Sequence, residues 1–578
     1  MELVQSEQIN LEHVKNRKTT SRKKVGDLKV VLVALYRYQN FPVRIIQPLL
    51  EDIDGVTPHS IFFKHVDANT FDPFSDTEGE LFAETIADLN PDLVGFSVMT
   101  PHVPIVKDLN AIVRKNSNAK IIWGGVHPTI DPEQCIEEAD IVCVGEGEGA
   151  IIDLVKRMRD GKDYSDIQNL WVKNNTGITK NPGRPLIQDL DALPFPSYCN
   201  DSYIFINDDK IDKVDRAIED RLLWIQGSRG CPFVCSFCVN SVTQPLFKDK
   251  GKYRRVRSPE NIAEEARGQL DLVKKANLPA DWKHTVLFID EVFGRDKEWL
   301  KEFEVIFPKE VGLPFYMETL PHPNLVNDDT LNSFVNSGVD TINFGIQTGS
   351  DHIRNKIFMR PTKNKQIIEI ANTIAARGVT IRYDLIADNP YDTIETLIET
   401  VDLLLQLPKP LEFNLFRLQW FPGYPLTNRA LADGHITKED TEVDSLVQRT
   451  TNDWAYVPKR AFNNKKILIT NVIWLVVWGH VGDNVARYAV SSNSVFANIC
   501  LRYLSAKSVV LGRLVGIGGL VGKHLWLARL RVALVCISKG EIKELCSKVV
   551  YVLKNKLRGQ TGQLGVPIEH SGHHKLSD

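Results

Sequence analysis

The stretch Leu222–Cys238 reads LLWIQGSRGCPFVCSFC, a short apolar run followed by a glycine-flanked loop with three cysteines. The run Leu222–Gln226 has the length and composition of a buried strand. The thiols of Cys231, Cys235 and Cys238 are spaced closely enough to bind one metal or one iron–sulfur cluster. A tetrahedral zinc site would need a fourth Cys or His, and no other one occurs between Cys199 and His284. On a cubic iron–sulfur cluster, three thiolates would leave one iron open to an exogenous ligand.

The strand before this loop opens a series of alternating strands and helices that runs to about residue 425. Further strands are predicted at Thr285–Ile289, Pro314–Glu318, Thr341–Ile346, Thr380–Ile386 and Glu412–Gln419. Helices are predicted between them at Asn261–Lys275, Lys297–Phe307, Asp328–Asn336, Lys365–Ala376 and Ile394–Leu405. This series predicts a partial (βα)6 TIM-type barrel at 221–425, with its chemistry in the loops that follow the strands.

Another alternating series precedes it, at residues 28–160. Strands are predicted at Lys29–Leu35, Ser60–His65, Asp92–Val98, Lys120–Trp123 and Asp140–Val144, and helices at Val43–Asp52, Glu78–Leu89, Val106–Lys115, Pro132–Glu138 and Gly149–Arg159. Short apolar strands separated by helices are typical of a parallel sheet covered on both faces. The pattern predicts an α/β, flavodoxin-like doubly wound domain, whose ligand binds beyond the carboxyl ends of the strands. Residues 161–220 are rich in loops with Pro and Gly, and we expect a linker there.

Composition and charge exclude several classes of protein. With 578 residues, 43% of them hydrophobic and 25% charged, the chain has the composition of a multidomain globular protein. Nine cysteines are too few for a disulfide scaffold, and a net charge of −3 does not predict a nucleic-acid partner. Residues 1–27 are polar and basic, without the apolar core of a signal peptide, so we expect a cytoplasmic protein.

Residues 426–578 differ from the rest of the chain, and we expect a mostly helical region followed by a tail. Residues 461–560 contain 15 Lys or Arg and only three acids, a net charge of +12. Ile467–Gly482 is uncharged and places Trp474 and Trp478 on one face of a predicted helix. This helix is short for a membrane span, which leaves a buried or an interfacial helix. With Trp526, these features predict a lipid-like substrate or peripheral contact with the anionic inner face of the membrane.

The spacing CxxxCxxC, with an aromatic residue just before the last cysteine, resembles the radical S-adenosylmethionine (SAM) superfamily. The resemblance implies that the three cysteines bind a [4Fe–4S] cluster, which an electron donor such as flavodoxin or ferredoxin would reduce. The open iron would bind SAM, whose cleavage gives a 5′-deoxyadenosyl radical. Matching positions of the barrel imply SAM contacts from Phe237, Asp290, Glu291, Gln347, Ser350 and Asp384. For Asp290 and Glu291, the alternative is a surface acid pair.

Glycines follow three strands of the first domain, in Gly95-Phe96-Ser97-Val98-Met99-Thr100, Gly124-Gly125-Val126-His127-Pro128-Thr129 and Gly145-Glu146-Gly147-Glu148-Gly149. In this order they resemble the cobalamin-binding domain fused to many radical SAM enzymes, and the likeness covers about residues 29–425. It implies cobalamin contacts from Ser97, Thr100, Gly124, Gly125, His127, Thr129, Gly145, Glu146, Gly147 and Glu148.

Two missing motifs refine this expectation. The Gly-x-Gly-x-x-Gly fingerprint of NAD-binding domains does not follow the first strand. The Asp-x-His-x-x-Gly motif that supplies a cobalt ligand is missing as well. We therefore expect cobalamin to bind base-off, without a histidine on cobalt and with His127 lining the groove for the nucleotide tail.

The two resemblances together imply a cobalamin-dependent radical SAM enzyme that methylates an unactivated carbon of a small-molecule or lipid-like substrate. One SAM would supply the substrate radical, and a second would supply the methyl group through cobalamin. One alternative is a cyclase or rearrangement enzyme that uses both cofactors without methyl transfer. A second alternative is an iron–sulfur redox sensor. No aromatic spacing matches an RNA-binding motif, so nucleic acid is not expected as a partner.

Overall fold

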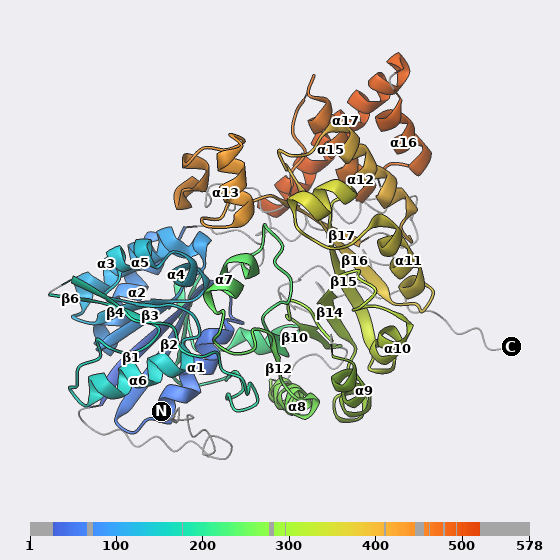
Figure 1. Cartoon of the computed structure of the whole chain (residues 1–578). Helices are drawn as coiled ribbons and strands as arrows, with labels where there is room; N and C mark the ends of the chain where they lie inside the picture. Colours follow the sequence, from blue (N-terminus) through green and yellow to red (C-terminus); the bar gives the residue numbers. More distant parts are fainter. Residues whose placement is uncertain are drawn as a thin grey trace, which may run out of the picture. The chain divides into compact units, whose positions relative to one another are not determined.

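The computed structural model describes residues 27–65, 73–175, 177–276, 282–294, 296–409, 412–445, 456–461, 463–477, 480–492 and 494–520. The chain divides into two compact units, which join between Tyr456 and Val457. The first unit contains two large β-sheets and their helices, and the described part of the second is helical (Figure 1). The first unit therefore extends beyond the barrel end predicted at residue 425, and it includes α13 (Pro425–Ala432) and η4 (Glu439–Thr441).

The first large sheet has nine strands in the order β7-β6-β5-β4-β3-β1-β2-β8-β9. Its parallel centre consists of β1 (Leu28–Tyr36), β2 (Val56–His65), β3 (Leu93–Ser97), β4 (Lys120–Gly124) and β5 (Ile141–Cys143). The strand order 2-1-3-4-5 is that of flavodoxin-like folds, as the sequence predicted. The order reverses between β1 and β3, and ligands of such sheets bind at this point, beyond the carboxyl ends of the strands.

Helices cover both faces of this sheet, because successive residues of each strand point to opposite sides. Val31 and Val33 of β1 belong to one core, and Val30 and Leu32 belong to the other. The first core contains residues of α2 (Asp76–Leu89), α3 (Val103–Asn116) and α5 (Pro132–Glu138), and the second contains residues of α1 (Phe41–Glu51) and α6 (Glu148–Arg159). Two short helices, η1 (Thr100–His102) and α4 (Val126–Ile130), follow β3 and β4 at the carboxyl edge.

The segment 161–220 adds strands to this sheet, so the prediction of a linker was wrong. A hairpin of β6 (Leu170–Asn174) and β7 (Gly177–Lys180) extends the sheet beyond β5. At the opposite edge, β8 (Tyr203–Asn207) pairs parallel to β2, and β9 (Lys210–Asp212) follows it. The rings of Tyr203 and Phe205 pack against Phe62 of β2. These contacts explain why a segment rich in Pro and Gly still forms strands.

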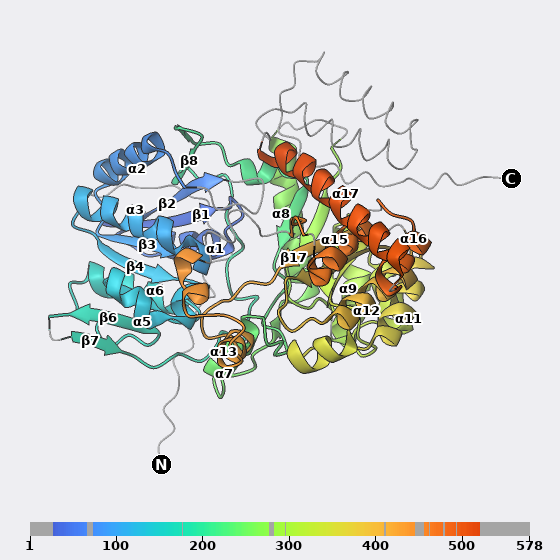
Figure 2. The same cartoon turned by 90° about the horizontal axis from the view of Figure 1, so that it is seen from above.

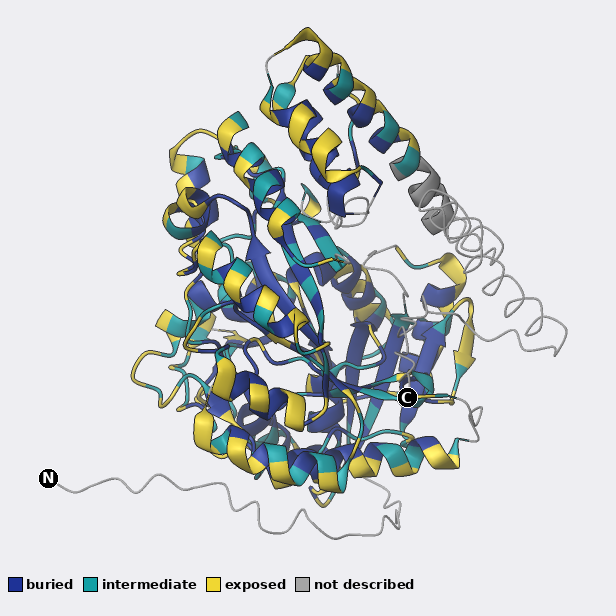
Figure 3. Cartoon of the chain, turned by 90° about the vertical axis from the view of Figure 1, so that its right-hand side faces the viewer, coloured by how far each residue is buried: buried dark blue, intermediate teal, exposed yellow. Residues whose placement is uncertain are grey.

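The second large sheet is the partial barrel that the sequence predicted. Its six strands run in chain order: β10 (Leu222–Ile225), β13 (Thr285–Phe288), β14 (Phe315–Thr319), β15 (Val339–Gln347), β16 (Thr380–Ala387) and β17 (Glu412–Arg417). The helices are α8 (Pro259–Lys275), α9 (Lys297–Glu310), α10 (Asp328–Asn336), η3 (Ile353–Ile357), α11 (Asn364–Ala375) and α12 (Ile394–Gln406). Figure 3 shows that the helices are exposed on their outer faces and buried where they meet the strands.

A small hairpin follows β10 and frames the cysteine loop. It consists of β11 (Ser228–Arg229) and β12 (Arg255–Val256), which pair antiparallel. The loop and the helix α7 (Asn240–Leu246) lie between them in the sequence. This hairpin is absent from the predicted series, because two-residue strands carry no recognisable pattern.

In the second unit, α15 (Lys465–Val477) contacts α16 (Asp483–Ser491) and α17 (Val495–Leu520), and Figure 2 shows the three helices together. Every residue from Leu468 to Val477 is buried, including Trp474, so the structure favours the buried helix over the interfacial one. Asn471 interrupts this apolar helix, and its side-chain amide donates to the carbonyl of Lys459 and to Ser505 Oγ. Trp478 and Trp526 lie outside the described residues.

In the described part of the chain, no single helix combines the length and the apolar composition of a membrane span. Only the bent pair Asp483–Ser491 and Val495–Leu511 meets those criteria together.

Candidate functional site

The cysteine loop begins at Gly230, directly after β11. Gly230 has φ +84°, and a Cβ there would lie 2.4 Å from the carbonyl oxygen of Tyr253, so only glycine fits. Two hydrogen bonds donated by Ser236 attach the loop to the segment after β15. Its amide N donates to the carbonyl of Phe358, and its Oγ donates to the carbonyl of Ile357 at 2.6 Å. The loop is thus fixed at the carboxyl edge of the barrel.

Cys231 and Cys235 are buried, Cys238 is half-buried, and all three are free thiols. Burial raises the pKa of Cys231 to about 12 and also raises that of Cys238. Without bound metal the thiols of Cys231 and Cys238 therefore stay protonated, and metal binding has to displace these two protons. Among the described residues, no three Cys, His, Asp or Glu side chains surround a point that would suit one metal ion. A cubic cluster has no such requirement, because each thiolate binds a different iron. The three thiols of the cysteine loop therefore fit a [4Fe–4S] cluster.

Phe237 and Arg360 lie beside these thiols. The Phe237 ring packs edge-on against Phe358, with their centroids 5.0 Å apart. Arg360 Nη1 donates to Cys235 Sγ at 3.6 Å, and the Arg360 side chain is buried. A buried guanidinium next to a cluster ligand can bind a carboxylate such as that of SAM. The sequence reasoning missed Arg360, because it lies in the loop after η3, outside every motif.

Asp290 and Glu291 follow β13, at the carboxyl edge of the barrel. The Asp290 carboxylate accepts from the amide N of Gly227 at 2.9 Å and from Ser228 Oγ, so it holds the segment before the cysteine loop. Burial raises the pKa of Asp290 to about 7, and desolvation by the surrounding protein also raises the pKa of Glu291. Glu291 remains accessible to solvent, whereas Asp290 is buried. A surface acid pair is therefore excluded for Asp290.

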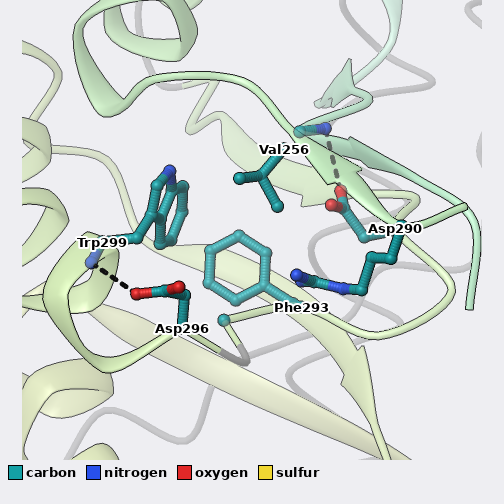
Figure 4. Close-up of a pocket in the computed structure, with 8 residues that line it drawn as sticks. Val256, Asp290, Phe293, Asp296 and Trp299 are labelled. Atoms are coloured by element: carbon teal, nitrogen blue, oxygen red, sulfur yellow. Dashed lines mark hydrogen bonds between the residues drawn. The ribbon is translucent and has the colours of Figure 1, made fainter. Parts of the chain in front are cut away.

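Asp290 also borders a pocket next to the barrel strands. Figure 4 shows its carboxylate at one side of the pocket, the ring of Phe293 in the centre and the ring of Trp299 at the other side. On that other side, Asp296 accepts a bond from the amide N of Trp299 at 3.2 Å. Val256 of β12 and Gly227, the residue before β11, also line this pocket, so it borders the hairpin that frames the cysteine loop.

Gln347 and Asp384 belong to the neighbouring strands β15 and β16, and Ser350 lies three residues after the end of β15. Gln347 is the last residue of β15 and has φ +64°. Gly345, two residues before it, is paired with Asp384 of β16. The Asp384 carboxylate accepts from Asn343 Nδ2 at 2.7 Å and from Asn414 Nδ2 at 2.8 Å. Burial raises the pKa of Asp384.

Several buried polar atoms in this area have no hydrogen-bond partner within the described residues, among them Ser350 Oγ, Arg360 Nε and Asn389 Nδ2. Buried polar atoms are seldom left without a partner in proteins, so these atoms fit a polar ligand. The side chains around the cysteine loop therefore suit SAM, with its carboxylate, amino and hydroxyl groups.

Glu318 is a further acid that the sequence reasoning missed. It belongs to β14, where its partner in the sheet is Asn343 of β15. Solvent reaches the side chain, yet the surrounding protein raises its pKa to about 7, and the charge of Asp384 adds to the shift. The available signal was an acid at the end of an apolar strand. Glu318 can act there as a hydrogen-bond donor or acceptor toward a substrate near neutral pH.

The predicted cobalamin contacts lie at the carboxyl ends of β3, β4 and β5. Gly125 has φ +113°, and a Cβ there would lie 2.8 Å from the carbonyl oxygen of Val98. Thr129 joins the two glycine loops: its Oγ1 donates to the Gly125 carbonyl at 2.7 Å and accepts from the Gly145 amide N at 3.0 Å. Asn40, which follows β1, donates to Ser97 Oγ at 3.4 Å. The glycine loops thus form one connected edge at the switch point, where ligands of such sheets bind.

His127 has a different role from the predicted one. Its ring is fully buried, with Nδ1 3.2 Å from Thr100 Oγ1 and Nε2 2.7 Å from Gln134 Oε1. Burial lowers its pKa, which keeps the ring neutral. Since both nitrogens are engaged within the protein, His127 orients Thr100 and does not line an open groove or face a metal.

Glu146, in the loop after β5, and Glu148, the first residue of α6, have charged partners within the protein. Their carboxylates accept bonds from Arg229 and Arg255, the arginines of the β11–β12 hairpin. The hydrogen bonds of both carboxylates are therefore made within the protein, without a cobalamin group as partner. Direct contact of Gly145 and Gly147 with cobalamin stays a prediction, as do the contacts of Ser97, Gly124 and Thr129.

Comparison with known proteins agrees with this arrangement. Residues 29–155 match the B12 binding domain family, and residues 225–404 match the Radical SAM superfamily. The uncharacterized methyltransferase PH0819 of Pyrococcus horikoshii is 27% identical over 61% of this chain and 72% of its own length. The anaerobic magnesium-protoporphyrin IX monomethyl ester cyclase of Rubrivivax gelatinosus is 24% identical over 58% of this chain and 57% of its own length.

A solved structure shows the same fold. The cobalamin-dependent S-adenosylmethionine radical enzyme OxsB, with aqua-cobalamin and S-adenosylmethionine bound, covers 92% of this chain and 81% of its own, with a TM-score of 0.58 and 15% identity. The two family matches, in the same order as the two sheets, account for both predicted cofactor sites. The chain therefore contains a B12-binding domain followed by a radical SAM domain, and it is an enzyme whose cofactors are cobalamin, SAM and a [4Fe–4S] cluster.

Proposed function

We propose that the protein is a methyltransferase that transfers a methyl group to an unactivated carbon of a small-molecule or lipid-like substrate. The observation that carries the proposal is the direct bonding between the two cofactor regions. The loop after β5, in the B12-binding domain, contacts the hairpin that frames the cluster cysteines. When bound, the cluster supplies an electron to SAM, and cobalamin supplies a transferable methyl group. A methyl transfer that uses both needs the two sites to open onto one substrate.

The residues of the barrel have separate tasks in this proposal. Cys231, Cys235 and Cys238 hold the cluster, and Arg360 and Gln347 hold SAM beside it. Asp384 and its two asparagine partners form a polar row across β15, β16 and β17. Glu318 lies next to this row and would orient the substrate through a hydrogen bond.

A second candidate is ring formation or rearrangement without methyl transfer. The relative named as a magnesium-protoporphyrin IX monomethyl ester cyclase supports it, while the relative named as a methyltransferase supports the first candidate. Mass spectrometry of the product separates the two, because only methyl transfer adds a methyl group derived from SAM. An iron–sulfur sensor would form no 5′-deoxyadenosine when reduced in the presence of SAM.

The substrate class rests on the second unit. Phe496, Ile499, Tyr503 and Val510 of α17 are exposed large hydrophobic residues, and the region around them is strongly basic. These features support the proposal of a lipid-like substrate or peripheral contact with an anionic membrane, although the buried Trp474 takes no part. Liposome co-sedimentation at low salt tests it. Protein that stays in the supernatant with anionic liposomes would exclude the membrane contact.

A reducing partner completes the proposal. A low-potential donor such as flavodoxin or ferredoxin would reduce the cluster. Replacing dithionite by reduced flavodoxin or ferredoxin in the SAM cleavage assay tests this directly, and no cleavage with either protein would contradict it.

A further inference from the structure

Two arginines next to the cysteine loop are bonded to the two glutamates of the loop after β5. Arg229 Nη2 donates to Glu148 Oε1 at 2.7 Å, and Arg229 Nη1 donates to Glu146 Oε1 at 3.2 Å. Arg255 Nη1 donates to the same Glu146 oxygen at 2.8 Å. The four side chains are largely shielded from solvent, with exposed fractions between 5% and 17%. They form one buried ion-pair network.

The arginines belong to the framework of the cysteine loop. Arg229 is in β11, two residues before Cys231, and Arg255 is its direct partner in β12. Any shift of Arg229 along or across the hairpin therefore moves the start of the loop that carries the cysteines. The Arg254 and Tyr253 segment before β12 also contacts that loop, through the close approach of Tyr253 to Gly230.

The glutamates belong to the framework of the predicted cobalamin edge. Their loop starts at Gly145, whose amide N is bonded to Thr129. A Cβ at Gly145 would lie 2.9 Å from the ring of Phe247, which follows α7, so the loop also touches the cluster-bearing segment through its backbone. The second carboxylate oxygen of Glu146 accepts from the amide N of Ile187 at 2.8 Å. The position of this loop is thus fixed from the barrel side as well as from its own sheet.

The charges make the network sensitive to the loss of any member. Burial disfavours ionisation of Glu148, but Arg229 and Arg255 outweigh it and lower the pKa of Glu148. Burial opposes the charge of Arg229 in the same way, while Glu148 and Glu146 raise the pKa of Arg229. A buried charge that loses its partner is strongly destabilising, whereas removal of both partners is tolerated better.

We propose that Arg229 and Arg255 are positioning residues, which fix the cobalamin loop against the hairpin of the cluster loop through Glu146 and Glu148. The two glutamates act through the arginines and do not touch cobalamin. Cobalamin affinity then depends on residues of the barrel hairpin, and the relative placement of the two cofactors depends on the same ion pairs. The inference rests on the proposed function in one respect: it requires that residues 145–149 border the cobalamin site.

A double-mutant cycle separates this role from direct binding. The full-length protein with reconstituted cluster is titrated anaerobically with hydroxocobalamin, as wild type and as the variants Glu148→Gln, Arg229→Gln and both together. Each single change should weaken binding about tenfold, within the range of typical coupling between sites. The affinity of the double variant should lie within about twofold of that of the single variant with the lower affinity. One change already removes the interaction, so the second adds little.

The contrary outcome is equally clear. If Glu148 contacts cobalamin itself, Glu148→Gln costs as much in the Arg229→Gln background as in the wild type, and the two losses multiply. That result overturns the inference. Failure of the wild type to bind hydroxocobalamin at all would instead refute the cobalamin site on which the proposed function depends.

Two controls guard against a general loss of structure. Asp153→Asn removes an ion pair with Arg184 that includes none of the four residues of the network, and it should leave the affinity unchanged within twofold. Arg229→Lys keeps the charge but cannot bond both glutamates in a fork, so it should fold and still bind several-fold more weakly than wild type. An affinity of Arg229→Lys equal to that of wild type would contradict the positioning role, even if Arg229→Gln does not fold.

A spectroscopic readout tests the placement of the cofactors independently of affinity. With cobalamin saturating as Co(II) and the cluster reduced, the two paramagnets broaden each other's electron paramagnetic resonance signals according to their separation. The coupling should become more heterogeneous in Arg229→Lys and stay as in the wild type in Asp153→Asn, at equal iron content. An unchanged coupling in Arg229→Lys would overturn the inference.

Discussion

Arg229 Nη2 donates to Glu148 Oε1 across 2.7 Å, and this bond joins the strand before the cluster cysteines to the loop after β5. The two residues are 81 positions apart in the sequence, with Arg229 in the β11–β12 hairpin and Glu148 at the start of α6. Their contact shows that the predicted cobalamin edge and the cluster loop are parts of one compact unit. Transfer of a group between two cofactors requires such fixed placement.

The cysteine loop gives the first prediction. Cys235→Ala should abolish cluster assembly and SAM cleavage, because the remaining two thiols cannot complete the set of three ligands. Cobalamin should still be bound, since its predicted contacts lie in the other sheet. Iron and sulfide analysis and formation of 5′-deoxyadenosine measure both effects. Cys199→Ser, at an exposed cysteine outside the loop, is the matched control. Wild-type cleavage in Cys235→Ala would refute the cluster assignment.

Gly345 offers a test of the SAM site that does not remove a polar group. A Cβ at Gly345 would lie 2.4 Å from Gln347 Nε2 and 2.7 Å from Arg360 Nη2. Both atoms end flexible side chains, so Gly345→Ala should displace them without unfolding the protein. We expect SAM affinity to fall about tenfold or more, measured by equilibrium dialysis, with cobalamin affinity unchanged. Gly268→Ala, where the added Cβ meets open space, should leave both affinities unchanged. Unaltered SAM binding in Gly345→Ala would place SAM elsewhere.

The buried Asp290 predicts a pH dependence of stability. Its pKa is raised from 3.8 to about 7, so the folded protein holds this proton more tightly than the unfolded chain does. The contribution of Asp290 to stability is therefore complete below pH 3.8 and is lost as the pH rises through about 7.

The variant Asp290→Asn removes this loss while keeping an acceptor for Gly227. In the protein without bound ligands, its melting temperature should exceed that of the wild type by about 2–4 °C at pH 8 and by less at pH 5. Asp271→Asn is the control, because the exposed Asp271 is paired with Lys274, which lowers its pKa. An Asp290→Asn difference that does not grow with pH would show that Asp290 ionises normally.

The histidines predict the state of bound cobalamin. The loop directly after β1 contains no histidine, and His127 is enclosed with both ring nitrogens bonded. Cobalamin should bind base-off, and the electron paramagnetic resonance spectrum of its Co(II) form should show no nitrogen superhyperfine splitting. His127→Ala should leave this spectrum unchanged, although it should weaken binding by releasing Thr100. Nitrogen splitting that disappears in His127→Ala would identify His127 as a ligand.

Much of this arrangement could be predicted from the sequence, because the parallel strands are short apolar runs with glycines at their ends. The helix Asp328–Asn336 and the helix Pro132–Glu138 were predicted with the boundaries that the structure has. Asn327 and Asp131 cap these helices, which is why their starts were recognisable. The cluster site could be predicted from the cysteine spacing, because no other short segment of the sequence contains three cysteines.

The rest depended on contacts between distant residues. Strands β8 and β9 form because Tyr203 and Phe205 pack against Phe62. Phe62 is far from them in the sequence, so the local pattern does not predict this contact. Arg360 reaches Cys235 only because the loop after η3 folds back onto the cysteine loop. The contact of Glu148 with cobalamin stays a prediction, and its ion pair with Arg229 could not be read from local sequence, because the two residues are 81 positions apart.

The central claim, methyl transfer to carbon, is tested most directly by isotope labelling. The reconstituted enzyme is incubated anaerobically with reductant, SAM that carries a trideuterated methyl group, and an extract of cells lacking the gene. We expect 5′-deoxyadenosine, S-adenosylhomocysteine and a new product that carries one trideuteromethyl group on carbon. Formation of 5′-deoxyadenosine together with a new product that contains no deuterated methyl group would contradict methyl transfer and leave the cyclase or rearrangement activity in its place.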